Sequence, residues 1–414
     1  MIRRISVRDL RPGMFVTAVA DGWVPLSQGV SGIPGYVHSA DEILALARQG
    51  YREVFVDMRA AVSGGRRVSR FTDGNAQARD LDRELERLPD GQRGTVISAQ
   101  RDDPMGEQLD ARVRMVRACY GETLRVVGEL FTAAAQGRSV RMSLAREAVQ
   151  LALDTVPNDS AAWFWAARLE QYGAWLHVHS VNVFALSLQF GLDLGLKREA
   201  LTCLGVAALL HDVGQTRLPV DLMGRRGPFT DDQEQIFRTH CAEGEALLRQ
   251  QPDVPPSVLR SVREHHERHD GKGYPDGLAG DRRGLFGRIL ALADALERMM
   301  GTGSQGERVS PAQAVNLLYA GRGRAHAEED LERFIRFAGV FPPGSMVRIS
   351  DGRYGMVWRH DPEHPLSPLV NVAYDETRRP ISPVRVPLAA EGLRAEQAMR
   401  VQLEQTHPQR LAPA

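Results

Sequence analysis

Histidines gather in the middle of this chain in a pattern that could bind metal ions. Seven of the twelve histidines lie between residues 177 and 269: His177, His179, His211, His240, His265, His266 and His269. His211 is followed directly by Asp212, and His265 directly by His266. Imidazole and carboxylate groups without thiolates are the ligands of zinc, iron or manganese sites that activate water. The pattern therefore indicates a metal-dependent hydrolase.

The apolar periodicity predicts five successive helices that carry candidate ligands on their core-facing sides. They lie at about 172–190, 201–211, 230–247, 256–265 and around 290–294, and they carry His179, His211, His240, His265 and Asp294 in that order. Thr230 and Gln233 have the spacing of a capping box at the start of the third helix. The helices would thus direct the ligands toward a common core.

A set of buried imidazoles needs a different explanation from a single one, which is usually a hydrogen-bonded core residue. Burying a polar group without a partner costs about 1–3 kcal/mol. A pair of metal ions about 3.5–4 Å apart would give the whole set one partner, and could share a hydroxide while holding a phosphate oxygen. Asp212 would bridge the ions. His179 and Asp294 would complete the ligands of one ion, and His240, His265 and His266 those of the other.

The remaining two histidines are interpreted as lying outside the site. His177 is two residues from His179 and points to the other side of its helix. His269 lies in a loop. That loop continues through Asp270 to Pro275, where Gly271 and Gly273 permit close approach of the backbone to a ligand. It is either a tight surface turn or a substrate-contacting loop, and its position beside the histidine pair favours the second interpretation.

Composition limits the class of protein. The chain has 414 residues, no formal net charge, 43% hydrophobic residues and only three cysteines. These values predict a soluble cytoplasmic protein with two or three domains and without a disulfide framework. They favour neither a nucleic acid polymer nor an anionic membrane surface as a partner. No apolar run reaches the length of a membrane span, and the first residues lack the apolar core of a signal peptide.

Period and composition divide the chain into five parts. The expected parts are a small α+β regulatory domain at 1–60, a linker at 61–110, a helical metal-binding domain of five to eight helices at 111–340, a small β-barrel-like module at 341–390 and a polar tail, helical or disordered, at 391–414. Within the first part, 41–48 has the pattern of a helix and 51–57 that of a strand. Within the fourth, Asp351-Gly352 predicts a hairpin between strands at 346–350 and 355–359, and 369–374 a further strand. The chain should therefore be mostly α.

Five motifs resemble the HD-GYP domain, the branch of the HD phosphohydrolase superfamily that hydrolyses the bacterial messenger cyclic di-GMP. They are His211-Asp212-Val213-Gly214, Thr239-His240-Cys241-Ala242-Glu243-Gly244, His265-His266-Glu267, Gly271-Lys272-Gly273-Tyr274-Pro275 and Ala293-Asp294-Ala295-Leu296. The resemblance runs from about 165 to 335. Residues 10–16 resemble a domain of unknown function that often precedes HD-GYP domains, and 341–352 a small β extension that often follows them.

The resemblance implies an HD-type helical bundle and a set of site residues. Two divalent ions, iron or manganese, would be held by His179, His211, Asp212, His240, His265, His266 and Asp294. A metal-bridging hydroxide would open cyclic di-GMP to linear pGpG. Asp212, Gln215, Lys272 and Tyr274 would take part in catalysis, and Gly271, Gly273, Pro275 and Arg217 would shape the loop or contact the substrate.

Three positions depart from the family pattern. Gln215 stands where the family has a lysine that faces the phosphate. Hydrogen bonds to charged groups contribute about 1.5–3 kcal/mol, so loss of this charge would slow turnover about 10- to 100-fold, unless Arg217 or Lys272 compensates. Residues 303–306 lack the arginines of an Arg-Pro-Tyr-Arg stretch. Trp175 stands where some members have a glutamate that helps hold a third metal, so two ions are expected.

Three hypotheses remain open. The first is an active cyclic di-GMP phosphodiesterase, with activity reduced by Gln215. The second is a signalling module that keeps the fold and metals but binds cyclic di-GMP or a partner, such as a diguanylate cyclase. The third is an HD phosphohydrolase that acts on another nucleotide. In each case the chain could form a homodimer.

Overall fold

A computed structural model describes residues 2–6, 16–19, 53–57, 104–155, 159–169, 175–223, 229–301 and 309–399. The chain divides into two units, Met1–Asp102 and Asp103–Ala414. In the first unit, β1 (Ile2–Ser6), β2 (Val16–Val19) and β3 (Glu53–Asp57) form an antiparallel sheet of order β1-β3-β2. The strand predicted at 51–57 coincides with β3, whereas the helix predicted at 41–48 lies outside the described residues.

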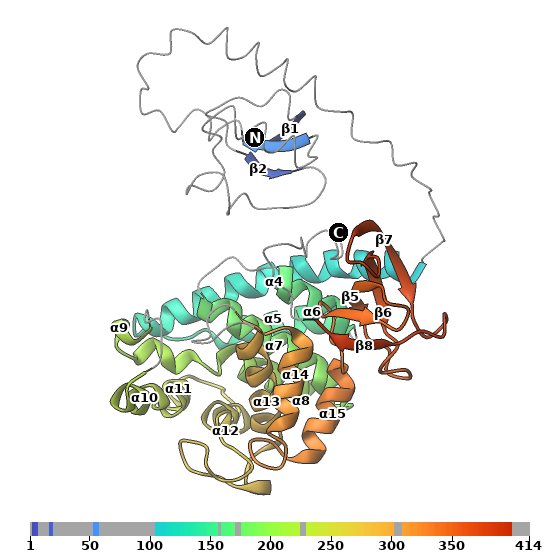
Figure 1. The fold of residues 1–414 in the computed structure, drawn as a ribbon. Coiled ribbons are helices and arrows are strands. Elements are labelled where there is room, and N and C mark those ends of the chain that lie inside the picture. The colour runs from blue at the N-terminus through green and yellow to red at the C-terminus, as the bar shows by residue number, and fades with distance from the viewer. Residues whose placement is uncertain are drawn as a thin grey trace. The chain divides into compact units, whose positions relative to one another are not determined.

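The second unit is mostly helical, as predicted (Figure 1). Its α-helices are α4 (Pro104–Ala135), α5 (Met142–Thr155), α6 (Ser160–Leu169), α7 (Trp175–Asp193), α8 (Arg198–Leu210), α9 (Val220–Met223), α10 (Asp231–Arg238), α11 (His240–Arg249), α12 (Pro256–Glu264), α13 (Leu285–Met300), α14 (Pro311–Ala320) and α15 (Glu328–Ala338), with short 3₁₀ turns η2 (Val213–Arg217) and η3 (Gly280–Arg282). These twelve α-helices of the described residues exceed the expected five to eight, because several are only two or three turns long. α4 begins inside the range predicted as a linker.

α7 lies at the centre of the helical unit. It packs against α4, α6, α8 and α13, and nearly every side chain from His179 to Gly191 is buried. A helix that is apolar on all sides is the kind that sits inside a core. The described residues include no helix that is long and apolar enough to cross a membrane.

The helix predicted at 230–247 is two helices, and this corrects the sequence interpretation. The capping box at its start is confirmed, since Thr230 and Gln233 exchange both hydrogen bonds. α10 ends at Arg238, where the Thr239 amide donates to the Ile236 carbonyl at 3.1 Å, a tighter turn than an α-helix makes. A new helix, α11, then begins at His240. Ile236, four residues before the buried His240, is 43% exposed.

A small antiparallel sheet follows the helices, as predicted, at one end of the unit (Figure 1). Its strands are β4 (Met346–Ile349), β5 (Tyr354–Arg359), β6 (Leu369–Tyr374), β7 (Pro380–Pro387) and β8 (Ala395–Ala398), in the order β7-β6-β5-β4-β8. β4 and β5 pair across the predicted Asp351-Gly352 turn. Among the described strands, β7 and β8 are the two edges and do not pair with each other, so the sheet is open. The predicted barrel-like closure is therefore wrong for these strands. β8 lies inside the range predicted as a tail.

Two tryptophan side chains pack between the sheet and the helices. The indole nitrogen of Trp165, on α6, donates to the Trp358 carbonyl on β5 at 2.8 Å, and the two rings lie 5.7 Å apart. Trp358 is also 1% exposed and belongs to the main helical core. Part of the β module therefore joins the helical core, while most of its other buried apolar residues form a second cluster.

Candidate metal centre

The seven predicted ligands lie together in the helical unit. They come from the middle of α7 (His179), the end of α8 (His211), the residue before η2 (Asp212), the start of α11 (His240), the end of α12 (His265 and His266) and the middle of α13 (Asp294). Six are buried, and His266 keeps 15% of its side chain exposed. The structure thus gathers the whole predicted set, while its role in binding metals stays a prediction.

A close backbone crossing brings two parts of the cluster together. η2 packs against α11, and Gly214 lies at the contact. A Cβ at Gly214 would come within 2.0 Å of the His240 carbonyl oxygen and 2.4 Å of the Gly244 nitrogen. Only glycine permits this approach. The crossing places Asp212 next to His240, although 28 residues separate them in the chain.

Asp212 lies between two groups of imidazoles, one at each carboxylate oxygen. Its Oδ2 is 3.4 Å from His179 Nε2 and 3.3 Å from His211 Nε2. Its Oδ1 is 3.2 Å from His240 Nε2 and 3.7 Å from His265 Nε2. This is the arrangement that a bridging carboxylate requires, with one oxygen for each of two cations.

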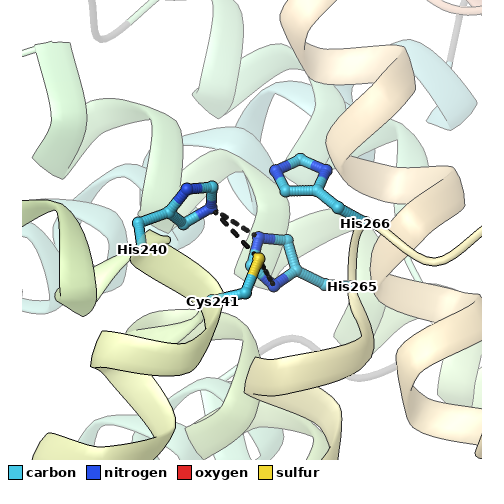
Figure 2. A group of neighbouring side chains, drawn as sticks. All are labelled: His240, Cys241, His265 and His266. Atoms are coloured by element: carbon cyan, nitrogen blue, oxygen red, sulfur yellow. Dashed lines mark hydrogen bonds between the residues drawn. The ribbon is translucent and has the colours of Figure 1, made fainter. Parts of the chain in front are cut away.

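The imidazoles present lone pairs to one another, which is the observation that tests whether a metal fits. The Nδ1 atoms of His211, His240 and His265 contact the carbonyls of Ala208, Phe237 and Val262 at 2.6–2.8 Å. Because a carbonyl only accepts, each Nδ1 carries the proton and each neutral ring has an unprotonated Nε2. The Nε2 atoms of His240 and His265 are 3.3 Å apart and turned toward each other (Figure 2). Two acceptors at this distance need a cation between them, so the donor set fits divalent metals.

Two imidazoles and the central carboxylate have the charge states that metal ligands need. Burial lowers the pKa of His265 to about 4, and burial with the neighbouring His265 also lowers the pKa of His266. Burial opposes a charged Asp212, yet the surrounding imidazoles outweigh it and hold the pKa of this carboxyl well below its usual range. His265 and His266 are therefore neutral beside a charged Asp212 at neutral pH.

A network behind His179 was not found by sequence reasoning. His179 Nδ1 contacts a carboxylate oxygen of Glu297, and Glu297 also accepts from the Asn182 amide at 3.0 Å. The Tyr120 hydroxyl donates to Asn182 Oδ1 at 2.6 Å. Burial opposes a charged His179, but Glu297, Asp212 and Asp294 outweigh it and raise its pKa. Carboxylates of this kind fix the orientation of metal-binding imidazoles. The available signal was the spacing of Glu297, three residues after Asp294 on one helix face.

Two more residues at the centre were not predicted. Arg298, one turn after Asp294, donates to Asp294 Oδ1 at 2.7 Å and lies 3.4 Å from Asp212 Oδ2. The Cys241 sulfur lies 3.5 Å from His240 Nε2, so the cluster contains a buried thiol where the sequence suggested none (Figure 2). Burial raises the pKa of Cys241, which favours the neutral thiol.

The loop after the histidine pair packs tightly on the cluster. A Cβ at Gly273 would lie 2.3 Å from the Arg268 nitrogen and 2.5 Å from the His266 oxygen. Buried Glu267 accepts from the amides of Asp276 and Leu278 at 2.6 and 2.9 Å. The Tyr274 ring lies 4.8 Å from the His266 ring, and the Arg238 guanidinium lies over its face. Burial raises the pKa of Tyr274, so its phenol keeps its proton.

The other predicted substrate-side residues are spread out. Arg217 and Lys272 are exposed, and the backbone amide of Lys272 donates to Asp270 Oδ1 at 3.1 Å. Gly271 has a positive φ of 71°, and Pro275 follows Tyr274 through a cis peptide. Gln215 is buried, and neither atom of its amide has a hydrogen-bond partner among the described residues. Residues 303–306 lie outside the described ranges.

Two histidines interpreted as lying outside the site, and the tryptophan in place of a possible third-metal ligand, have other contacts. His177 packs edge-on against Phe131 on α4, away from the cluster. His269 pairs its backbone with Ala325 at 3.0 Å. Trp175 stacks on the His179 ring at 5.2 Å, so an aromatic face covers this ligand where a glutamate would add a donor.

The candidate ligands lie in a part of the chain that is similar to HD domains. The family model described as "HD domain" matches residues 164–331, which contain all seven candidate ligands. The model described as "Domain of unknown function (DUF3391)" matches residues 2–145. The second match runs past the predicted boundary at residue 60 and into α4 and α5.

Two relatives of this chain are named as cyclic di-GMP phosphodiesterases. The chain is 26% identical over 376 residues to "Cyclic di-GMP phosphodiesterase PA4108" of Pseudomonas aeruginosa, covering 90% of this chain and 86% of that protein. It is 34% identical over 146 residues to "Cyclic di-GMP phosphodiesterase response regulator RpfG" of Xanthomonas campestris, covering 35% of this chain and 38% of that protein. The predicted likeness to the HD-GYP family, with a domain of unknown function ahead of it, is confirmed.

Two further similarities are more distant or shorter. A solved structure of Bd1817, an HDG"Y"P protein from Bdellovibrio bacteriovorus, aligns with 81% of this chain and 98% of its own at 18% identity and a TM-score of 0.45. The chain is 31% identical over 121 residues to "3'3'-cGAMP-specific phosphodiesterase 1" of Vibrio cholerae, covering 29% of this chain and 28% of that protein.

Proposed function

We propose that this chain is a metal-dependent phosphodiesterase that hydrolyses cyclic di-GMP to linear pGpG. The observation that carries the proposal is the carboxylate of Asp212 between two sets of imidazoles, with its Oδ1 lacking a hydrogen-bond partner among the described residues. The proposal is supported by PA4108, a relative named as a cyclic di-GMP phosphodiesterase, which aligns along most of both chains.

Seven side chains would hold two divalent ions, with iron or manganese as the proposed identity. They are His179, His211, Asp212, His240, His265, His266 and Asp294. When bound, such ions supply activation of water and stabilisation of charge on a phosphate oxygen. The chain contributes the fixed ring orientations, since backbone carbonyls hold three of the imidazoles. It also excludes water from all but one edge, where His266 is partly exposed.

The loop from Gly271 to Pro275 would form the substrate side of this opening. Tyr274 presents a protonated phenol and a ring against His266, and Arg238 adds a positive charge over that ring. A cyclic dinucleotide carries two phosphodiester charges and two flat bases, so a cation beside an aromatic face suits it. Gln215 has two amide hydrogens without partners among the described residues and can donate them to an anion, although it brings no charge.

The direct test is hydrolysis by the purified full chain loaded with iron or manganese under anaerobic conditions. Chromatography should detect pGpG formed from cyclic di-GMP, and faster reaction than with 3'3'-cGAMP or with nucleoside phosphates. Faster cleavage of 3'3'-cGAMP would instead favour a phosphodiesterase specific for that nucleotide, as one relative is named. Absence of cleavage of every member of the panel would contradict an enzymatic role.

A second candidate function is binding without rapid turnover, and the observation that favours it is Gln215. The uncharged amide removes the cation expected to face the phosphate. If turnover is limited by this missing charge, Gln215→Lys should raise it about 10- to 100-fold. A large gain would indicate that the natural chain is adapted to bind cyclic di-GMP or a partner such as a diguanylate cyclase. Homodimer formation, cytoplasmic location and a regulatory role for the N-terminal domain stay predictions.

A further inference from the structure

Arg298 places a positive charge inside the candidate metal centre. It lies on α13 one turn after Asp294, and its Nε donates to Asp294 Oδ1 at 2.7 Å. Its Nη2 lies 3.4 Å from Asp212 Oδ2 and 3.4 Å from His266 Nε2. The guanidinium therefore contacts both carboxylates that are proposed to hold the metals.

The carboxylate contacts of Arg298 fall on one half of the centre. Asp212 Oδ2 and Asp294 Oδ1, which the guanidinium contacts, are also the oxygens that face His179, at 3.4 and 3.0 Å. Asp212 Oδ1, which faces His240 and His265, has no hydrogen-bond donor among the described residues. One half of the centre thus already has a cation on its carboxylate oxygens, whereas Arg298 reaches the other half only at the His266 ring.

We propose that Arg298 makes the two metal positions unequal, so that the His240–His265 half binds a divalent ion first and the His179–His211–Asp294 half binds a second ion more weakly. This inference rests on the two-metal site of the proposed function. It adds a residue that lies outside the predicted ligands and acts on them as a competing cation.

The charges explain the direction of the effect. Asp212 and Asp294 bring two negative charges, and the guanidinium neutralises one of them before any metal arrives. An ion in the His179 half would have to displace Arg298 from the same two oxygens, or bind beside a fixed positive charge in a buried site of low dielectric. Charge-assisted hydrogen bonds to carboxylates are among the stronger ones, so their loss lowers the net affinity. An ion in the His240 half gains the unpaired Asp212 Oδ1 without such a loss, although Arg298 also neighbours His266.

The test is a titration of the metal-free full chain with Mn²⁺ alone. Calorimetry measures the binding events, and electron paramagnetic resonance detects the signal of two coupled ions. Wild type should bind one ion tightly and a second at least about tenfold more weakly. Arg298→Gln should tighten the second event at least about tenfold and leave the first within about twofold. Equal affinities in wild type, or a second event that is unchanged or weakened in Arg298→Gln, would overturn the inference and leave Arg298 as a structural ion pair.

A matched control and two assignments complete the experiment. Arg288→Gln removes the same charge from the same helix, but Arg288 pairs with Asp330 at 3.3 Å, so both binding events should match wild type. In wild-type background, His179→Ala should remove the weaker event and His265→Ala the tighter one; the reverse assignment would contradict the inference. If Arg298→Gln does not fold, Arg298→Met keeps the apolar stem and should give the same tightening. The metal titration contains no substrate, so its result can be interpreted even if the protein does not hydrolyse cyclic di-GMP.

Discussion

The metal cluster and the substrate side of the site are built in different ways. The candidate ligands are buried and come from rigid positions in or next to helices, and all of them converge. The substrate-side residues lie in η2 and in the loop after α12, and they range from buried Gln215 to exposed Lys272. The cluster is therefore fixed by the core of the protein, whereas the substrate side depends on short segments that pack over it. Changes in the first region should act on metal binding, and changes in the second on substrate handling.

The largest effect is expected from Asp212→Asn. The amide keeps the shape of the side chain but removes the charge between the two sets of imidazoles. Both metals should be lost, and hydrolysis should fall to background. Elemental analysis and a turnover assay would check this outcome. Full metal content with wild-type turnover would mean that Asp212 does not bridge the ions.

The next effect is expected from Glu297→Gln, which weakens the group that orients His179. Loss of such a partner typically lowers metal affinity or activity about 10- to 100-fold. Glu245→Gln is the matched control, because Glu245 is also buried but pairs with Arg249 and Arg263, away from the cluster. Metal titration of the two variants would compare them, and equal affinities would show that Glu297 does not act through His179.

Acid should destabilise the protein through a histidine that belongs to neither region. Burial, with Arg283 and Arg268 nearby, lowers the pKa of His326 to about 4. The unfolded chain, in which this pKa is about 6.5, then binds more protons than the folded chain between these values. The free energy of unfolding should fall as pH falls from about 6.5 to about 4, and this contribution should be constant above 6.5. Urea unfolding of metal-free protein across this range should show a smaller fall in His326→Gln than in wild type; parallel curves would contradict the assignment.

A smaller and more local effect is expected from Gly273→Ala. The added methyl meets the backbone of Glu267 and Arg268 at 2.5 Å or less, so the loop must shift. Such overpacking typically costs about 1–3 kcal/mol. KM for cyclic di-GMP should rise while the tighter metal affinity stays unchanged. Gly121→Ala, where nothing lies within 4 Å of the new Cβ, is the control and should match wild type. Loss of metal binding in Gly273→Ala would show that the two regions are not separable.

The smallest effect is expected from Lys272→Ala. The side chain is exposed, and it is the backbone amide of Lys272 that donates to Asp270 Oδ1 in the turn. Exposed charges contribute little, so KM and kcat should stay within about twofold of wild type at physiological salt. A tenfold or larger loss of kcat/KM would indicate that Lys272 supplies the phosphate-facing charge that Gln215 lacks.

The sequence predicted the metal cluster better than the loop, for a physical reason. A ligand on the core-facing side of a helix has its direction set by the 3.6-residue period, so His179 and Asp294 could be placed from spacing alone. The spacing of Glu297 and Arg298 puts them on the same helix face as Asp294, but it does not determine whether their long side chains turn toward the cluster or toward solvent. The break at Thr239 depends on a single tight turn, which periodicity does not encode. The orientation of Gln215 likewise depends on the crossing of η2 over α11.

The most direct test of the central claim measures metal content and turnover in one anaerobic preparation of wild type and of His211→Ala. The account predicts iron or manganese at two ions per chain in the loaded wild type, together with conversion of cyclic di-GMP to pGpG. We predict that His211→Ala loses the more weakly bound ion and falls to background activity. Equal hydrolysis by the two proteins, or a loaded wild type that leaves cyclic di-GMP intact, would contradict it.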